Sequence, residues 1–389
     1  MGKHKNVNKP CPCGSGKKYK KCCISRPLPP PEVLEAARRF DRPPFDPFMQ
    51  AGYLTGRQTI NTTHEGKRYR AVGNRVYTRP LNEPFHQFIL DIFNREVLGM
   101  EWLTKERTKQ NSERHPLSLW YEEVVNDIQS VTSKDRSKNL FRVQQSGNVR
   151  LLLATAYDYY SVLHCNAPLQ PNFLKRLNSK TSFQGARYEL AIAGIAVRAG
   201  FNITWNNSKG KHCEFIGVHR STGEKVAFEA KSHHRAGVLG NAGEPFNPES
   251  ARTKIMDHVR EAIEQNTEKL PLVIFDDINL PLTPGIDFED KKWVSEVDDA
   301  LKAFGFMDGT KTETYGALIL TNFAWYFYDS VSHLKENEVI SYFYVNNHNP
   351  IMPETISLLN GAAKQYGFVP PNLEEFDAEE FKDVSEPKQ

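Results

Sequence analysis

The chain has 389 residues, of which 39% are hydrophobic and 25% are charged. It is longer than the roughly 100–200 residues of a typical domain, and its composition is that of a globular protein with a buried core. No stretch approaches the roughly 18–20 consecutive apolar residues of a membrane-spanning helix, and no apolar segment follows the basic N-terminus. We therefore expect a cytoplasmic protein with no secretory signal and no membrane partner.

The net charge of +3 is unevenly distributed along the chain. Residues 1–26 contain eight Lys or Arg residues and no acidic residue, so the remainder carries a net negative charge. A basic segment of this kind favours a polyanionic partner such as nucleic acid or an acidic protein surface. At the other end, residues 373–389 are rich in Asp and Glu and are expected to form a solvated tail.

The N-terminal segment concentrates four of the six cysteines within thirteen residues: Cys11, Cys13, Cys22 and Cys23. In a reducing compartment such a cluster is more often a metal site than a set of disulfides. The segment has almost no apolar core of its own, and four thiolates around Zn²⁺ supply folding free energy on the order of 10 kcal/mol. A redox-active pair of adjacent cysteines and an unfolded basic tail are the alternatives.

The spacing of these cysteines, C-x-C-x8-C-C, resembles the SEC-C zinc module that is found at the C-terminus of the SecA translocation motor. The interior GSGKKYKKC also matches that module. The resemblance covers residues 1–26 and implies a structural Zn²⁺ ion held by the four cysteines. It also implies that the module recruits a partner, such as a protein or the ribosome, and takes no part in catalysis.

A proline-rich linker at 27–60 is expected to separate the zinc module from a mostly helical region at 61–180. That region begins with a predicted hairpin at 61–80, whose turn lies near Gly73. Apolar residues then follow at helical spacing, and we expect their aromatic side chains to form core rather than a base-stacking surface.

From residue 181 the pattern changes to alternating helices and strands, and residues 181–350 are expected to form an α/β domain before a C-terminal segment at 351–389. An Ala-rich helix is predicted at 184–200 and strands at 201–205, 213–219 and 225–231. Alternation on the third strand places Val226, Phe228 and Ala230 on one face and Glu229 with Lys231 on the other. A carboxylate and an ammonium group are costly to bury, so their placement side by side next to a core strand needs an explanation.

The arrangement Glu214…Glu229-Ala230-Lys231 resembles the PD-(D/E)xK nuclease superfamily. The resemblance implies that Glu214 and Glu229 bind a divalent metal ion and that Lys231 positions or activates the attacking water. It also implies that Glu189, on the preceding helix, adds a ligand. The chain departs from the family pattern in two places, because Cys213 replaces the motif proline and Glu214 replaces the usual aspartate.

The same resemblance implies a restriction-endonuclease-like mixed sheet flanked by helices, with later core strands at 272–277 and 315–320. A helix carrying a glutamine often follows the motif in this superfamily, and residues 255–265 fit that position. The (D/E)-x-K pattern alone occurs six times in the chain, and its strand context singles out Glu229. A surface ion pair between Glu229 and Lys231, or a degenerate and inactive nuclease fold, are the alternatives.

Phosphodiester hydrolysis requires that accumulating negative charge be neutralised and that a nucleophile form near neutral pH. A divalent metal ion meets both requirements, and carboxylate ligands select Mg²⁺ or Mn²⁺. We therefore expect a metal-dependent nuclease, acting on DNA rather than RNA because this fold mostly acts on DNA. A role in defence against foreign DNA is a further expectation, which rests on association and on no particular residue of the chain. The rival expectation is a non-catalytic adaptor in which the SEC-C module docks a partner and the nuclease-like domain merely binds. Whether the chain forms a homo-oligomer is left open.

Polar residues after the motif strand suggest a further set of ligands. One hypothesis is a second zinc site with ligands from His212, Cys213, His233 and His234. Exposed histidines after a strand are common, however, so we expect His233 and His234 to be exposed and to contact backbone phosphates.

Overall fold

The computed structural model describes the chain in several stretches. The described residues do not include the four cysteines of the predicted zinc module, the linker up to residue 59 or the acidic tail. Within the N-terminal module, the structure describes the short 3-10 turn η1 (Tyr19–Lys21). The described residues are 8–9, 18–21, 60–132, 146–206, 210–239, 243, 254–283, 285–303, 316–328, 337–343 and 351–369.

A three-stranded antiparallel sheet begins at Ile60. It consists of β1 (Ile60–His64), β2 (Lys67–Val72) and β3 (Arg75–Pro80), in that order. The predicted turn at Gly73 is confirmed, and the hairpin is extended by the additional strand β1. Glycine is required at this turn because its φ is +60° and a Cβ atom there would lie 2.4 Å from the carbonyl oxygen of Leu163.

The predicted helical region follows. Its aromatic residues are core as expected, since Phe85, Phe88 and Phe93 are almost completely buried and Phe85 packs edge-on against Tyr160. Among the described residues, no helix combines the length and hydrophobicity needed to cross a bilayer. The helices are α2 (Phe85–Phe93), the π-helical turn η2 (Asn94–Leu98), α3 (Met100–Arg107), α4 (Pro116–Thr132), α5 (Gly147–His164), α6 (Pro171–Leu177) and α7 (Phe183–Arg198).

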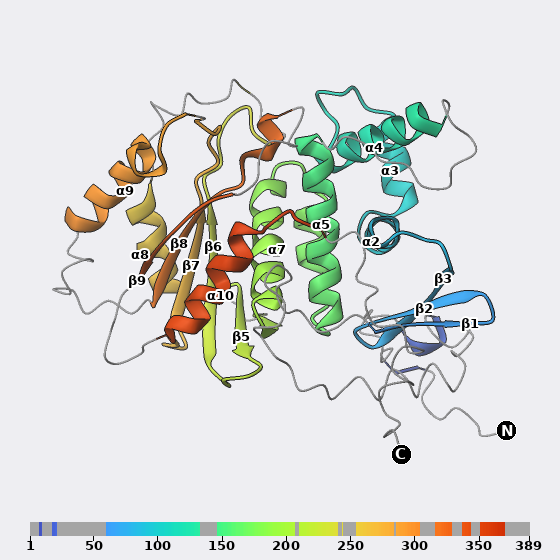
Figure 1. Ribbon diagram of the computed structural model, residues 1–389, viewed down its shortest axis with the longest axis horizontal. Helices are drawn as coiled ribbons and strands as arrows, with labels where there is room; N and C mark the ends of the chain where they lie inside the picture. The colour runs from blue at the N-terminus through green and yellow to red at the C-terminus, as the bar shows by residue number, and fades with distance from the viewer. Residues whose placement is uncertain are drawn as a thin grey trace, which may run out of the picture.

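A six-stranded mixed sheet flanked by helices forms the centre of the molecule (Figure 1). Its first three strands are antiparallel, the third, fourth and fifth run parallel to one another, and the last is again antiparallel. In spatial order the strands are β4 (Phe201–Trp205), β5 (Phe215–His219), β6 (Lys225–Ser232), β7 (Leu272–Asp277), β8 (Ala317–Asn322) and β9 (Glu338–Phe343). The α/β class is therefore confirmed.

Helices make the connections between the parallel strands and complete the layers. Helix α8 (Ile255–Gln265) joins β6 to β7, which confirms the helix predicted at this position. The turn η3 (Phe288–Asp290) and helix α9 (Lys292–Ala303) join β7 to β8. The turn η4 (Ala324–Phe327) follows β8, and α10 (Pro353–Lys364) follows β9.

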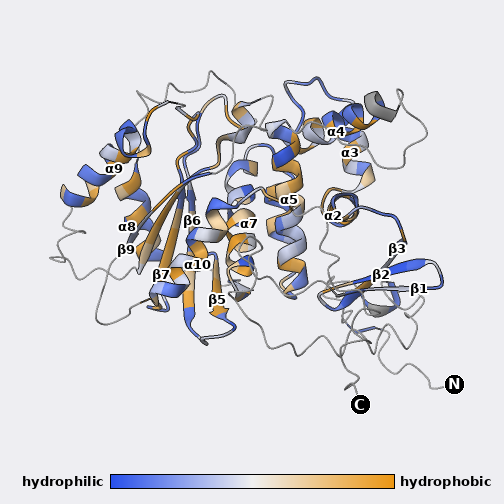
Figure 2. Cartoon of the chain, in the orientation of Figure 1, coloured by the Kyte–Doolittle hydropathy of each residue, from blue (hydrophilic) through white to orange (hydrophobic). Residues whose placement is uncertain are grey.

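Each face of the sheet packs against its own set of helices. Helices α8 and α9 cover one face, where Ala227 and Ile274 are buried, and helices α5, α7 and α10 lie on the other, where Phe228 and Phe275 are buried. The hydrophobic residues of the strands lie between these layers (Figure 2). The predicted alternation on β6 is confirmed, because Val226 and Phe228 belong to the α7 face and Ala230 packs against it.

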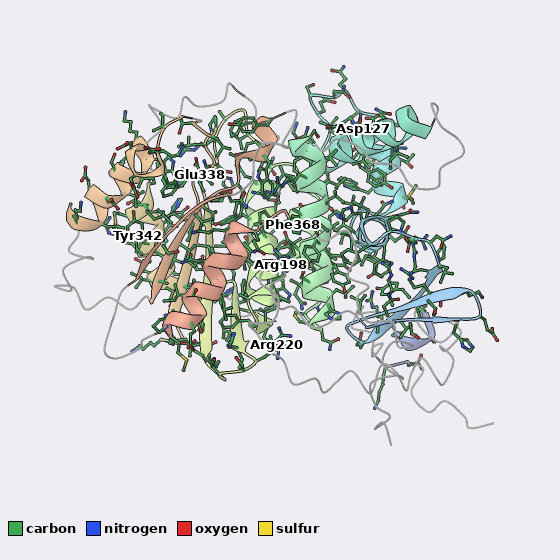
Figure 3. The ribbon with its side chains drawn as sticks, viewed as in Figure 1. Asp127, Arg198, Arg220, Glu338, Tyr342 and Phe368 are labelled. Atoms are coloured by element: carbon green, nitrogen blue, oxygen red, sulfur yellow. The ribbon has the colours of Figure 1, made fainter. Side chains whose placement is uncertain are left out.

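The C-terminal helix α10 belongs to the same core as the sheet. Tyr366, just beyond this helix, is buried and donates a hydrogen bond of 2.9 Å to Asp158 of α5. Arg198 at the end of α7, which is labelled in Figure 3, donates to the other oxygen of the same carboxylate at 2.8 Å. Residues from α5, α7 and the C-terminal stretch thus converge on one buried carboxylate.

The buried histidine His115, which precedes α4, should make the protein acid-sensitive. Its ring packs edge-on against Phe183, and its Nδ1 accepts a hydrogen bond of 3.2 Å from the backbone of Leu117. Burial lowers the pKa of His115 to about 4, although the negative charge of Glu106 opposes this shift. The neutral ring therefore stabilises the fold at pH values above about 6.5, the ordinary pKa of histidine, and that stabilisation is lost as the pH falls towards 4.

We expect the free energy of unfolding to fall by roughly 3 kcal/mol between pH 6.5 and 4 through this group, since each pKa unit corresponds to about 1.4 kcal/mol. Replacing His115→Gln keeps an acceptor near the Leu117 amide and removes the titrating ring. Urea unfolding followed at several pH values should show a shallower acid slope for the variant than for the natural protein. Equal slopes would contradict this role for His115.

Candidate functional site

Three glutamates from three elements converge beside the β5–β6 pair. Antiparallel pairing sets Phe215 opposite Phe228, and the backbone N–H of Glu214 donates to the carbonyl of Phe228 at 3.1 Å. The next position on β6 is Glu229, so the carboxylates of Glu214 and Glu229 approach each other across the strands. Helix α7 brings Glu189 to the same place, and its charge acts on both of the other carboxylates. The structure thus brings together the three predicted acids.

Glu189 is buried and is held by Arg176 of α6. Nη1 of Arg176 donates to Oε2 of Glu189 at 2.8 Å, and Nη2 donates to Oε1, so the contact is bidentate. The Arg176 side chain remains 45% exposed, so it places positive charge at the rim of the acid cluster. Arg176 was not predicted from the sequence, because a lone arginine 13 positions before Glu189 matches no motif.

The carboxyl groups of Glu214 and Glu229 are destabilised as anions. Burial, followed by the negative charges of Glu189 and Glu229, raises the pKa of Glu214 to about 9, while Arg176 opposes the shift. Burial raises the pKa of Glu229 to about 7 against the opposing charge of Lys231. Oε2 of Glu229 is buried and has no hydrogen-bond partner. An added positive charge would therefore stabilise the cluster.

Lys231 connects the acid cluster to helix α8. Its Nζ lies 3.2 Å from Oε1 of Glu229 and donates to the side-chain oxygen of Gln265 at 2.7 Å. A weaker contact of 3.4 Å reaches Glu261 on the same helix. The Lys231 side chain is 14% exposed, so it lies between strand and helix and is still in contact with solvent. The glutamine expected on the helix after the motif is thus in contact with the motif lysine.

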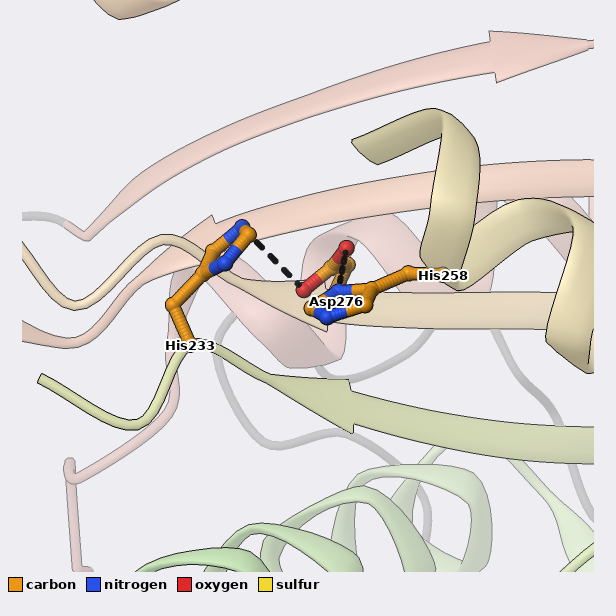
Figure 4. Close-up of side chains that lie close together, drawn as sticks. All are labelled: His233, His258 and Asp276. Carbon is orange, nitrogen blue, oxygen red and sulfur yellow. Dashed lines mark hydrogen bonds and ion pairs between the residues drawn. The ribbon is translucent and has the colours of Figure 1, made fainter. Parts of the chain in front are cut away.

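The two histidines that follow the motif strand differ in exposure: His234 is exposed as expected, whereas His233 is buried. His233 is only 7% exposed and does not project into solvent as expected. His212 donates to the carbonyl of Cys213, and burial raises the pKa of the Cys213 thiol to about 12, which disfavours the thiolate that zinc requires. His233 instead lies against His258 of α8 and Asp276 of β7 (Figure 4). The sequence analysis missed both of these partners.

Comparisons with known proteins identify one short motif. Residues 8–24 match the SEC-C motif family. The uncharacterized protein YccF of Bacillus subtilis (strain 168) is 64% identical to this chain over 36 residues, which are 9% of this chain and 10% of that relative. The chain thus spans about one tenth of the length of the curated relative that it matches, and no solved structure matches it. The predicted N-terminal motif is confirmed: residues 8–24 of this chain carry a SEC-C motif.

Proposed function

We propose that this chain is a metal-dependent nuclease that hydrolyses phosphodiester bonds, in DNA rather than RNA. One observation carries the proposal: Glu189, Glu214 and Glu229 meet in one cluster, and Lys231 contacts that cluster from the same strand as Glu229. A surface ion pair would not explain this arrangement, since Glu229 is 1% exposed and lies beside two further carboxylates.

The architecture supports a restriction-endonuclease-like fold for this domain. Helix α7 precedes an antiparallel unit, β4 to β6, and the sheet then continues through the parallel strands β7 and β8. The cluster corresponds to the acidic positions and the lysine of the PD-(D/E)xK pattern, with one acid from helix α7, one directly before β5 and one from β6. This correspondence includes Gln265, whereas Cys213 and Glu214 depart from the family pattern at the motif proline and aspartate.

The residues present fit a hard divalent cation such as Mg²⁺ or Mn²⁺. The donor set consists of carboxylate oxygens, and the buried Oε2 of Glu229 has no partner that would have to be displaced. Glu214 and Glu229 would hold the ion, and Glu189 would join them after leaving Arg176. When bound, such an ion supplies Lewis acidity and lowers the pKa of a water molecule.

The chain's own residues supply positioning and charge. Gln265 fixes the ammonium group of Lys231 at 2.7 Å, so this group is oriented before substrate binds. From that position Lys231 can donate to the attacking water or to a phosphate oxygen, where negative charge increases in the transition state. Arg176 at the rim is exposed enough to contact a backbone phosphate.

The direct test is cleavage of plasmid DNA by the purified full chain with Mg²⁺ or Mn²⁺, followed on gels. Glu229→Ala should reduce cleavage to the background level, whereas Glu268→Ala should cleave as the natural protein does. Glu268 is a suitable control because it forms a half-exposed ion pair with Lys225 outside the cluster. Cleavage that survives in Glu229→Ala, or no cleavage of DNA or RNA by any of the proteins, would count against the nuclease.

A non-catalytic adaptor is the second candidate function, and the SEC-C match at residues 8–24 favours it. In this proposal Cys11, Cys13, Cys22 and Cys23 bind a structural Zn²⁺ ion, and the folded module docks a protein or ribosome partner. Changing Cys22 and Cys23 to Ser should then abolish recovery of the partner in a pulldown, while the protein shows no metal-dependent cleavage. Retention of the partner by that variant would contradict docking through the module.

A further inference from the structure

A second cluster of metal-binding side chains lies at the carboxyl ends of β6 and β7 (Figure 4). The parallel register pairs Lys231 with Asp276, and the backbone of His233, just beyond β6, donates to the carbonyl of Asp277 at 3.1 Å. Helix α8 begins above the same strand ends and brings His258, on its first turn, to the carboxylate of Asp276. Three segments of the crossover thus meet at one point.

The three side chains have the separations of ligands to one ion. Nδ1 of His258 lies 2.8 Å from Oδ2 of Asp276, and Nε2 of His233 lies 3.8 Å from Oδ1 of the same carboxylate. The two imidazole rings lie face to face, with centroids 4.6 Å apart. A tetrahedral Zn²⁺ ion with bonds of about 2.0–2.2 Å separates neighbouring ligand atoms by roughly 3.4 Å, which falls between the two observed distances.

Two atoms of the cluster are buried without a hydrogen-bond partner. They are Nε2 of His233, a residue that is 7% exposed, and Oδ1 of Asp276, which is fully buried. Unsatisfied polar atoms are rare in protein interiors, because removing them from water is costly. Both atoms belong to the group whose ligand atoms all lie within 4.8 Å of one another. A cation between them would satisfy both.

We propose that His233, His258 and Asp276 bind a borderline transition-metal ion, with Zn²⁺ as the representative. Two imidazole nitrogens and one carboxylate oxygen suit Zn²⁺ and related ions and do not suit Mg²⁺, which prefers oxygen ligands. The site shares no ligand with the SEC-C cysteines or with the carboxylate cluster, and it does not depend on whether the chain cleaves nucleic acid.

The proposed ion would hold helix α8 in a fixed position relative to the sheet. It fastens the first turn of α8, through His258, to the ends of β6 and β7. The same helix carries Gln265 and Glu261, which contact Lys231. Three protein ligands also leave a fourth tetrahedral position for water or another donor group.

The test measures zinc content in a background without the SEC-C ligands. The full chain with Cys11, Cys13, Cys22 and Cys23 changed to Ser is loaded with Zn²⁺, desalted and analysed by elemental analysis. We expect about one zinc ion per chain, falling to about zero when His258→Ala is added. His212→Ala is the matched control, because this histidine of the same domain contacts a backbone carbonyl outside the cluster, and it should leave the zinc content unchanged.

The variant without the four SEC-C cysteines tests the proposal even if changes within the cluster impair folding. Its thermal midpoint should rise on addition of Zn²⁺, and X-ray absorption should report imidazole nitrogen among the zinc ligands. No zinc uptake by this protein would overturn the proposal. So would zinc that is lost in Glu229→Gln and retained in His258→Ala, since that result would assign the ion to the carboxylate cluster.

Discussion

If the proposed nuclease activity holds, replacing Lys231 with alanine should lower the rate of metal-dependent DNA cleavage by roughly 10²–10³-fold, the usual loss when one preorganised electrostatic donor is removed from an active site. The ammonium group is held 3.2 Å from Glu229 and 2.7 Å from Gln265, so it acts from a fixed position. Single-turnover cleavage with excess enzyme measures the rate of this step separately from DNA binding. The main loss should appear in that rate.

Two further variants separate the role of the lysine in catalysis from general charge effects. Lys225→Ala removes a half-exposed lysine from the start of the same strand and should leave the rate unchanged. Gln265→Ala should give a smaller loss than Lys231→Ala, because it releases the ammonium group without removing it. If Lys225→Ala and Lys231→Ala slow cleavage equally, the effect reflects overall charge, and the assignment of Lys231 is wrong.

Replacing Arg187 with methionine should lower the free energy of unfolding by about 3–5 kcal/mol, the cost of leaving a buried charge without its partner. Arg187 on α7 and Asp277 on β7 are fully buried and lie 3.4 Å apart. Burial raises the pKa of Asp277 to about 6 even though Arg187 opposes the shift. Without Arg187 that carboxylate would have to stay protonated or lose its place in the core.

The expected loss can be tested by urea unfolding at pH 7 with two comparisons. Adding Asp277→Asn to Arg187→Met should restore part of the stability, because the amide needs no counter-charge. Arg95→Met removes an exposed i,i+4 pair with Asp91 and should cost less than about 1 kcal/mol. A loss for Arg187→Met no larger than that for Arg95→Met would show that the buried pair contributes little.

Local patterns were sufficient to predict the elements around the carboxylate cluster. The Ala-rich run that ends at Gly200 predicted α7, and period-two alternation predicted β6 with Val226 and Phe228 on the inner face. These signals are strong because each element is amphipathic or buried throughout its length. The hairpin predicted at 61–80 has one turn, and the second turn at Glu65 and Gly66, which separates β1 from β2, was missed.

The two candidate sites differ in how many of their residues could be predicted from the sequence. Glu214, Glu229 and Lys231 are close in the sequence and follow a known pattern, so their convergence with Glu189 could be anticipated. The contact between His258 and Asp276 could not, because it depends on the crossover from α8 to β7, and the two residues form no spacing motif. A buried aspartate inside the apolar run LVIFDD was the one available signal.

The apolar core that runs without interruption from α2 to α10 limits how the chain can be divided. A fragment starting at α7 would lose its neighbour α5 and uncover the surface that buries Leu151 and Leu152. A fragment ending at β9 would lose Leu359 and Tyr366 from the same core. Newly exposed apolar surface of this kind promotes aggregation. Enzymology on a shortened protein should therefore begin with a piece that extends from α2 to at least Val369.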